Sequence, residues 1–228
     1  MSNVPCAARC KTNARKPSTR EVDRSENAGA LPLDACHLDY PLLFAPEFPR
    51  IRFPNLQSPM TNPIQQRLMQ ECISLAREAM RLGEVPIASV IARGDGQIVG
   101  WGWNELNAKR DRTMHAEIAA FRDAAGRYPV ETENLILVST LEPCVMCAGA
   151  AILCGVSTIV FGLRAPADGG MGRIKPPESP EAIVPEVIGP MMEADIRALF
   201  DEWLANHPQD DPQRQYVSQL MELNRTQH

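Results

Sequence analysis

Hydrophobic and polar residues follow regular patterns from residue 62 to residue 206. The first pattern is helical: it opens at Asn62-Pro63, a capping residue followed by proline, and it ends at Gly83. Its apolar positions recur every three or four residues, at Ile64, Leu68, Cys72, Leu75, Ala76, Ala79 and Met80. Two apolar stretches, residues 86–93 and 97–102, then flank Gly94-Asp95-Gly96 and predict a β-hairpin.

Helices and strands are expected in turn after the hairpin. Residues 114–125 have a helical pattern that stops at Gly126, and a strand is predicted over residues 134–140. A second helix and a second strand follow, at residues 143–154 and 157–163. This helix opens with proline and ends before glycine, as helices commonly do. A Pro/Gly-rich loop then leads to an amphipathic helix over residues 191–206. This order predicts an α/β fold with a mixed sheet and helices on both of its faces.

We expect one domain, over residues 59–207, between an N-terminal extension and a C-terminal tail. The extension, residues 1–58, begins as a polar stretch without periodicity and continues as a proline-punctuated one, so we expect it to be disordered or extended. It contains Arg and Ser, but its acidic residues argue against a transit peptide. The tail is assigned to residues 208–228.

The composition places the chain in a general class. Of its 228 residues 44% are apolar and 22% charged, which is ordinary for a protein with a sizeable core. No apolar run approaches the roughly 20 residues of a membrane span, and the N-terminal region lacks the apolar stretch of a secretory signal. Seven cysteines, an odd number, do not indicate a disulfide framework. We therefore expect a protein of a reducing, cytoplasmic compartment with no membrane partner.

Three short segments carry residues suited to metal chemistry. His115-Ala-Glu117 lies at the start of one predicted helix, Cys144-Val-Met-Cys147 lies at the start of another, and Asn104 ends the hairpin. One imidazole and two thiolates make a three-ligand zinc set, and a catalytic zinc keeps its fourth position for water. Glu117 has the wrong type and spacing to be needed as a fourth ligand, and it is well placed to manage the protons of that water.

This arrangement, H-x-E followed by P-C-x-x-C, resembles the signature of the zinc deaminases that act on nucleobases. The run of residues 141–150, Leu-Glu-Pro-Cys-Val-Met-Cys-Ala-Gly-Ala, is similar to the cytosine/guanine/tRNA-adenosine deaminase branch of the cytidine deaminase-like superfamily. The resemblance covers residues 62–165 well, the last predicted helix loosely, and residues 1–58 not at all. It implies a three-layer αβα sandwich, hydrolytic deamination and a homodimer or larger assembly.

The resemblance also implies a role for each residue of the three segments. His115, Cys144 and Cys147 would hold one Zn²⁺ per chain. Glu117 would take a proton from the zinc water, pass it to the ring nitrogen and then help ammonia to leave. Asn104 would hydrogen-bond the base.

Other readings of the cysteines and aromatic residues stay open. The zinc site is structural in one alternative, and the protein is then a non-catalytic interaction module; an intact Glu117 speaks against this. A second metal site would use four residues of the extension, Cys6, Cys10, Cys36 and His37. We expect Cys72 and Cys154 to be buried thiols. The helical spacing of Phe200 and Trp203 favours core packing over a role in capping the pocket.

The motif predicts the reaction, and two classes of substrate remain. One is a free base or nucleoside, such as cytosine or guanine, and the other is the wobble adenosine of a tRNA, which the run at residues 141–150 resembles locally. The net charge is −5, and residues 191–228 carry seven acidic and three basic residues, a poor match for RNA phosphates. The basic N-terminal region and a loop with Arg173 and Lys175 keep the RNA hypothesis open, but we favour the small molecule.

Two further substrate classes fit the sequence less well. The spacing from Cys144 to Cys147 is shorter than the one usual in riboflavin-pathway deaminases. An editor of single-stranded DNA would need a groove of aromatic and basic residues, for which the sequence gives no sign.

Overall fold

The computed structural model describes residues 62–128, 134–178, 182–211 and 213–226. In chain order the elements are α1 (Pro63–Arg81), β1 (Ala88–Ala92), β2 (Ile98–Trp103), α2 (Leu106–Lys109), α3 (Ala116–Ala124), β3 (Leu135–Leu141), α4 (Val145–Leu153), β4 (Val156–Leu163), β5 (Glu186–Ile188), α5 (Glu193–Asn206) and α6 (Arg214–Thr226).

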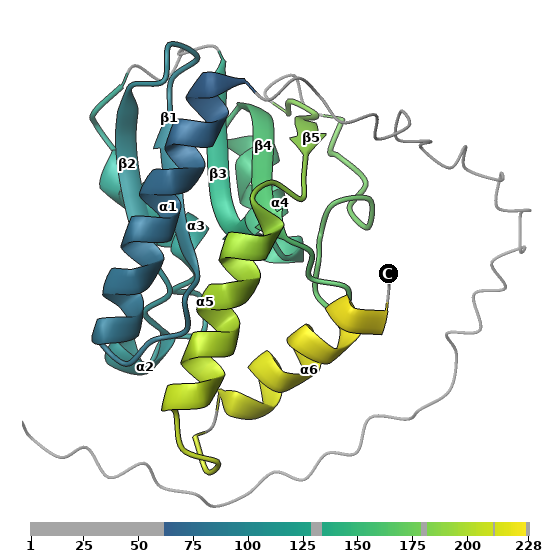
Figure 1. The fold of residues 1–228 in the computed structure, drawn as a ribbon. Helices are drawn as coiled ribbons and strands as arrows, with labels where there is room; N and C mark the ends of the chain where they lie inside the picture. Colours follow the sequence, from purple (N-terminus) through teal and green to yellow (C-terminus); the bar gives the residue numbers. More distant parts are fainter. Residues whose placement is uncertain (1–61, 129–133, 179–181, 212, 227–228) are drawn as a thin grey trace, which may run out of the picture. The chain divides into compact units, whose positions relative to one another are not determined.

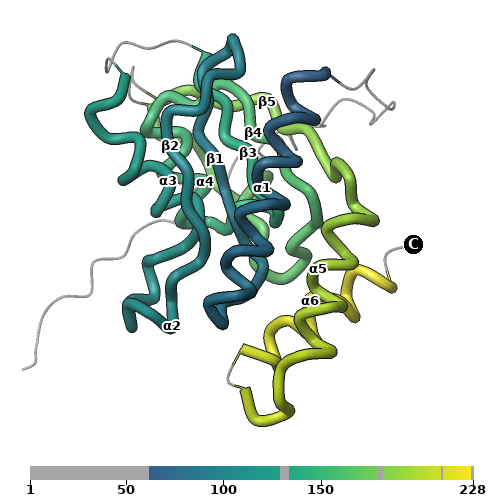
Figure 2. Tube along the Cα trace, turned by 60° about the vertical axis from the view of Figure 1, so that its left-hand side comes forward, coloured from purple at the N-terminus to yellow at the C-terminus, as the bar shows by residue number. Residues whose placement is uncertain are grey.

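The five strands form one mixed sheet in the order β2-β1-β3-β4-β5. β1 pairs antiparallel with both β2 and β3, whereas β3, β4 and β5 run parallel. Helices α1 and α5 cover one face of the sheet, and α3 and α4 cover the other (Figures 1 and 2). This confirms the predicted α/β fold, a three-layer αβα sandwich with a mixed central sheet.

Two hydrophobic cores lie on the two faces of the sheet because side chains alternate along each strand. One row across β1, β3 and β4 faces α1 and α5, and consists of Val90, Val138 and Val160. The next row faces α3 and α4, and consists of Ile91, Leu137 and Ile159. Every residue of β3 is buried, which explains why this strand is a continuous apolar run in the sequence.

The sequence predictions for the first helix and the hairpin are confirmed. The Asn62 side chain accepts a hydrogen bond from the Ile64 N–H at 2.9 Å, and Pro63 is the first helical residue, so α1 begins as its capping signal indicates. β1 and β2 form the antiparallel hairpin, and Gly96 in the turn has φ +85°, which glycine adopts without strain.

Three elements were missed by the sequence analysis, the first of which is the four-residue helix α2. The loop before α5 contributes β5 to the sheet edge, and residues 208–228, expected as a tail, contain the 13-residue helix α6. The buried residues of α6 form a stripe at helical spacing: Val217, Leu220, Met221 and Asn224. Because a short polar run precedes this helix, the stripe was overlooked in the sequence. The assignment of these residues to a tail was wrong, because α6 packs this stripe against the α1/α5 side of the domain.

The expectation for Cys154 was also wrong. Cys154 follows the last residue of α4 and is exposed, as is its neighbour Leu153. It lies beyond the end of the helical face on which Cys147 is buried. Cys72, Phe200 and Trp203 are fully buried, as expected.

The expectations for residues 1–58, including a second metal site at Cys6, Cys10, Cys36 and His37, lie outside the described residues. Within the described residues, no helix is both long and apolar enough to cross a membrane.

Candidate active site

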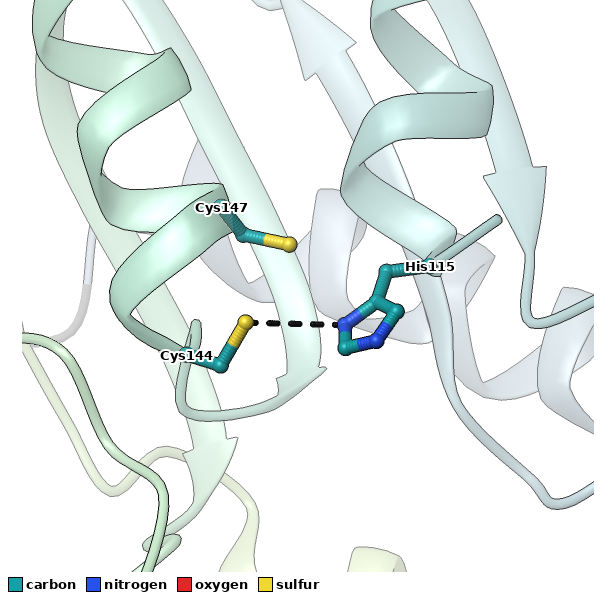
Figure 3. A group of neighbouring side chains, drawn as sticks. All are labelled: His115, Cys144 and Cys147. Carbon is teal, nitrogen blue, oxygen red and sulfur yellow. Dashed lines mark hydrogen bonds between the residues drawn. The ribbon is translucent and has the colours of Figure 1, made fainter. Parts of the chain in front are cut away.

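The three predicted metal ligands meet where two helices begin. His115 is the residue before α3, Cys144 is the residue before α4, and Cys147 lies in the first turn of α4. Because α4 follows β3 directly, its first turn lies at the carboxyl end of a parallel strand, the usual place for a ligand site in an α/β sheet. Figure 3 shows the imidazole and the two sulfur atoms pointing toward one another.

The donor atoms of these three residues suit zinc. They lie within 4.8 Å of one another, and Cys144 Sγ is 3.5 Å from His115 Nδ1. The pKa of Cys144 is lowered to about 4, chiefly because the Cys147 thiol donates a hydrogen bond to its sulfur and further because of His115. A thiolate at a helix start, an imidazole and a second thiol together form a set of nitrogen and sulfur ligands. Such a set suits zinc better than it suits harder cations.

Glu117 stands in the first turn of α3, two residues after the ligand His115. Its side chain is buried, with 3% of it exposed, and burial raises its pKa. The Cys147 side chain interacts with this carboxylate, so Glu117 lies directly beside the ligand cluster. A buried carboxyl group beside a set of metal-binding side chains is suited to taking up and releasing protons.

A cavity of about 680 Å³ opens onto this cluster. Its wall includes His115, Glu117 and Cys144, together with the predicted base-binding residue Asn104. Asn104 is buried, and its N–H donates to the Ile87 carbonyl at 2.9 Å, which holds it at the end of β2. The structure therefore brings together all five residues that were singled out in the sequence, with Cys147 buried behind the cavity wall.

The loop after β4 forms another part of the cavity wall and is fastened to the ligand turn. The Gly170 N–H donates to the Pro143 carbonyl at 2.8 Å, and the Ala165 N–H donates to the Glu142 carboxylate at 3.1 Å. A Cβ at Gly170 would come within 2.6 Å of the Cys144 carbonyl oxygen, so only glycine permits this approach. The loop and the ligand turn consequently form one packed unit.

Four polar residues of the cavity were not singled out in the sequence: Arg112, Asp168, Gln213 and Tyr216. Gln213 and Tyr216 come from the start of α6, the missed helix. Burial raises the pKa of the Tyr216 hydroxyl, and Asp168, to which the hydroxyl donates, raises it further. No local motif marks these residues, and it is the packing of α6 that brings Gln213 and Tyr216 to the cavity.

Comparison with known proteins places this site in a family. Residues 63–163 match the model described as the cytidine and deoxycytidylate deaminase zinc-binding region. A tRNA-specific adenosine deaminase 2 of Xenopus tropicalis is 35% identical over 122 residues, which are 50% of this chain and 71% of that protein. The chain belongs to this family of zinc-binding deaminases, and its His–Cys–Cys cluster is positioned to bind a metal ion.

Other relatives match over different shares of their length. The tRNA(Ile)-lysidine synthase of Deinococcus radiodurans is 42% identical over 107 residues, 46% of this chain, and this chain spans only 18% of that protein. A solved structure from a study of A-to-I editing by tRNA:A34 deaminases has 28% identity and a TM-score of 0.50, covering 59% of this chain and 99% of that one.

A guanine deaminase of Nitrosomonas europaea has the same fold. It is 23% identical with a TM-score of 0.50, and the match covers 63% of this chain and 85% of that one.

Proposed function

We propose that this protein is a zinc-dependent hydrolytic deaminase of a free nucleobase or nucleoside, such as cytosine or guanine. The reaction replaces the exocyclic amino group by a carbonyl: water adds to the ring carbon, the carbon–nitrogen bond breaks, and ammonia leaves. One observation carries the proposal: Glu117 and the ligand cluster lie on one cavity whose size is in the range of small-molecule sites.

Three of these residues would hold the metal, and the others would move protons or bind the base. His115, Cys144 and Cys147 would hold one Zn²⁺, which when bound supplies the Lewis acidity that lowers the pKa of water. The Glu117 carboxylate takes a proton from the attacking water, delivers it to the ring nitrogen and later protonates the leaving amino group. Asn104 hydrogen-bonds the base and orients the ring toward Glu117.

The position of α6 supports a small substrate. Gln213 and Tyr216 line the cavity, and Gln213 Oε1 accepts a hydrogen bond from Asn107 Nδ2 at 3.0 Å, so the start of α6 is tied to α2. At the other end of the helix, Asn224 Nδ2 donates to the Arg164 carbonyl at 3.0 Å. Residues 191–228, which include α6, carry an excess of acidic residues and so repel a phosphate backbone.

Deamination of a tRNA wobble adenosine to inosine is the second candidate. It is favoured by the names of several relatives that are more similar in sequence to this chain than the guanine deaminase is, including a tRNA-specific adenosine deaminase of Haemophilus influenzae that is 37% identical over 108 residues. In this case α6 would have to accommodate an RNA loop at the cavity. A homodimer and a cytoplasmic location, both expected from the sequence, remain predictions.

Ammonia release by the purified, zinc-loaded protein tests both candidates. The panel contains cytosine, guanine, adenine, their nucleosides and a tRNA with a wobble adenosine, and Glu117→Ala is the blank. We expect release from a base or nucleoside, and a loss in Glu117→Ala of at least the roughly 10²- to 10⁴-fold that a general acid–base group supplies, with zinc retained. Release from the tRNA alone would replace the first candidate by the second.

A further inference from the structure

Glu84 is a buried carboxylate that the proposed chemistry does not use. It lies between α1 and β1, and 2% of it is exposed. Its backbone is held firmly, because the Glu84 N–H donates to the Ala79 carbonyl at 3.0 Å and the Glu84 carbonyl accepts from Trp203 Nε1 at 2.9 Å. The carboxylate therefore extends from a fixed point in the core.

The carboxylate of Glu84 caps the short helix α2 from outside its own segment. The Ala108 N–H donates to Glu84 Oε1 at 2.9 Å, and the Asn107 N–H donates to the same carboxylate. Residues at these two positions of a helix normally donate to the side chain of the residue that precedes the helix. Here that residue is Glu105, whose side chain makes no capping bond. Glu84 takes its place across 24 residues of sequence.

The second oxygen of Glu84, Oε2, is buried and makes no hydrogen bond with the described part of the chain. Two further carboxylates, Glu105 and Asp211, act on it electrostatically and are of the same charge. A buried carboxyl group in this environment lowers the stability of the fold. Its role therefore lies in the segment that it holds in place.

The segment that Glu84 holds forms one wall of the cavity. It begins at Asn104, the residue proposed to bind the base, and continues through Leu106 and Arg112, all of which line the cavity. Its only helical turn is the one that Glu84 caps, and the side chain of Asn107 in this turn donates to Gln213, which also lines the cavity. A displacement of α2 would therefore move Leu106 and the turn that directly follows Asn104, whereas Glu117 stands on a separate element, α3.

We propose that Glu84 is a positioning residue for substrate binding: by capping α2 it holds residues 104–109 against the substrate. This inference rests on the proposed deaminase function. Loss of the cap should raise KM, because the binding wall loosens, and should change kcat little, because the zinc ligands and Glu117 lie on other elements.

Kinetics on the substrate that the ammonia panel identifies test this split. We expect Glu84→Ala to raise KM about tenfold, the effect of losing one hydrogen bond to a charged group, with kcat within about threefold and zinc content unchanged. Glu84→Gln keeps an acceptor oxygen and should restore KM. Glu84→Asp keeps the charge but shortens the side chain, so it should behave like Glu84→Ala and replaces it if that variant does not fold. Glu71→Ala, at an exposed glutamate of α1, is the control and should leave KM and kcat unchanged.

Hydrogen exchange gives a readout that does not depend on turnover. In Glu84→Ala and Glu84→Asp the amides of residues 104–109 should exchange about tenfold faster than in the unaltered protein, while those of β3 stay protected and Glu84→Gln remains slow. Unchanged exchange at residues 104–109, or a fall in kcat with KM constant, would overturn the positioning role. Absence of ammonia release by the unaltered protein would instead overturn the proposed function, and exchange would still decide whether Glu84 holds this wall.

Discussion

Helix α3 approaches β2 unusually closely, and this contact sets the position of two active-site residues. A Cβ added at Gly102 would lie 2.5 Å from the Cβ of Ala119 and 2.7 Å from the backbone nitrogen of Ala120. Ordinary van der Waals contact begins near 3.4 Å, so α3 would have to move outward by roughly 1 Å to accept a methyl group. His115 precedes α3 and Glu117 lies in its first turn, so both would move with it.

Gly102→Ala should therefore reduce both stability and activity. Overpacking of this kind typically costs about 1–3 kcal/mol, and the obstruction is backbone, which cannot rotate away. A misplacement of about 1 Å near the reacting groups costs on the order of 10²-fold in rate. We expect a fall of about 1–3 kcal/mol in the free energy of unfolding, a fall of roughly 10- to 100-fold in kcat and weaker zinc binding.

Urea denaturation, zinc titration and ammonia release measure these effects, with Gly149→Ala as the control. Gly149 lies within α4, and a Cβ there would meet nothing within 4 Å, so alanine should stabilise the helix by about 0.5–1 kcal/mol and leave kcat unchanged. If Gly102→Ala matched the unaltered protein in stability and kcat, the argument that close packing against β2 positions His115 and Glu117 would be refuted.

Three further predictions concern the metal, α6 and pH. Cys144→Ala should lose stoichiometric zinc, measured by metal analysis, because two donors remain; full retention would show that the ligand set is wrong. Asn224→Leu should lower the free energy of unfolding by about 1–3 kcal/mol in urea, because the Arg164 carbonyl loses its buried donor. Burial raises the pKa of Glu84 from its ordinary 4.5, so its contribution to stability is complete below that pH and is lost as pH rises through the raised value. Relative to Glu84→Gln, the unaltered protein should therefore be less stable at pH 8 than at pH 5; a pH-independent difference would contradict this.

The sequence alone determined the family of this protein and with it the class of chemistry. The candidate zinc ligands and Glu117 stand in two short segments, and each segment begins a helix whose start is signalled locally. The spacing from His115 to Glu117 and from Cys144 to Cys147 fixes which side chains leave one helix turn together. For the same reason the alternating helices and strands, and hence the layered fold, could be predicted from local patterns.

The tertiary structure decided the shape of the cavity and what supports it. Asp168 and Tyr216 meet there from a loop and from α6, and neither stands in a motif. Glu84 reaches α2 across 24 residues, and its own carbonyl is held by Trp203 across 119. Such partners are brought together by the packing of apolar faces against one another. A local pattern predicts which face of an element is apolar, but it does not predict which other face will pack against it. The reaction could therefore be predicted from residues near one another in sequence, whereas substrate selection depends on residues that only folding brings together.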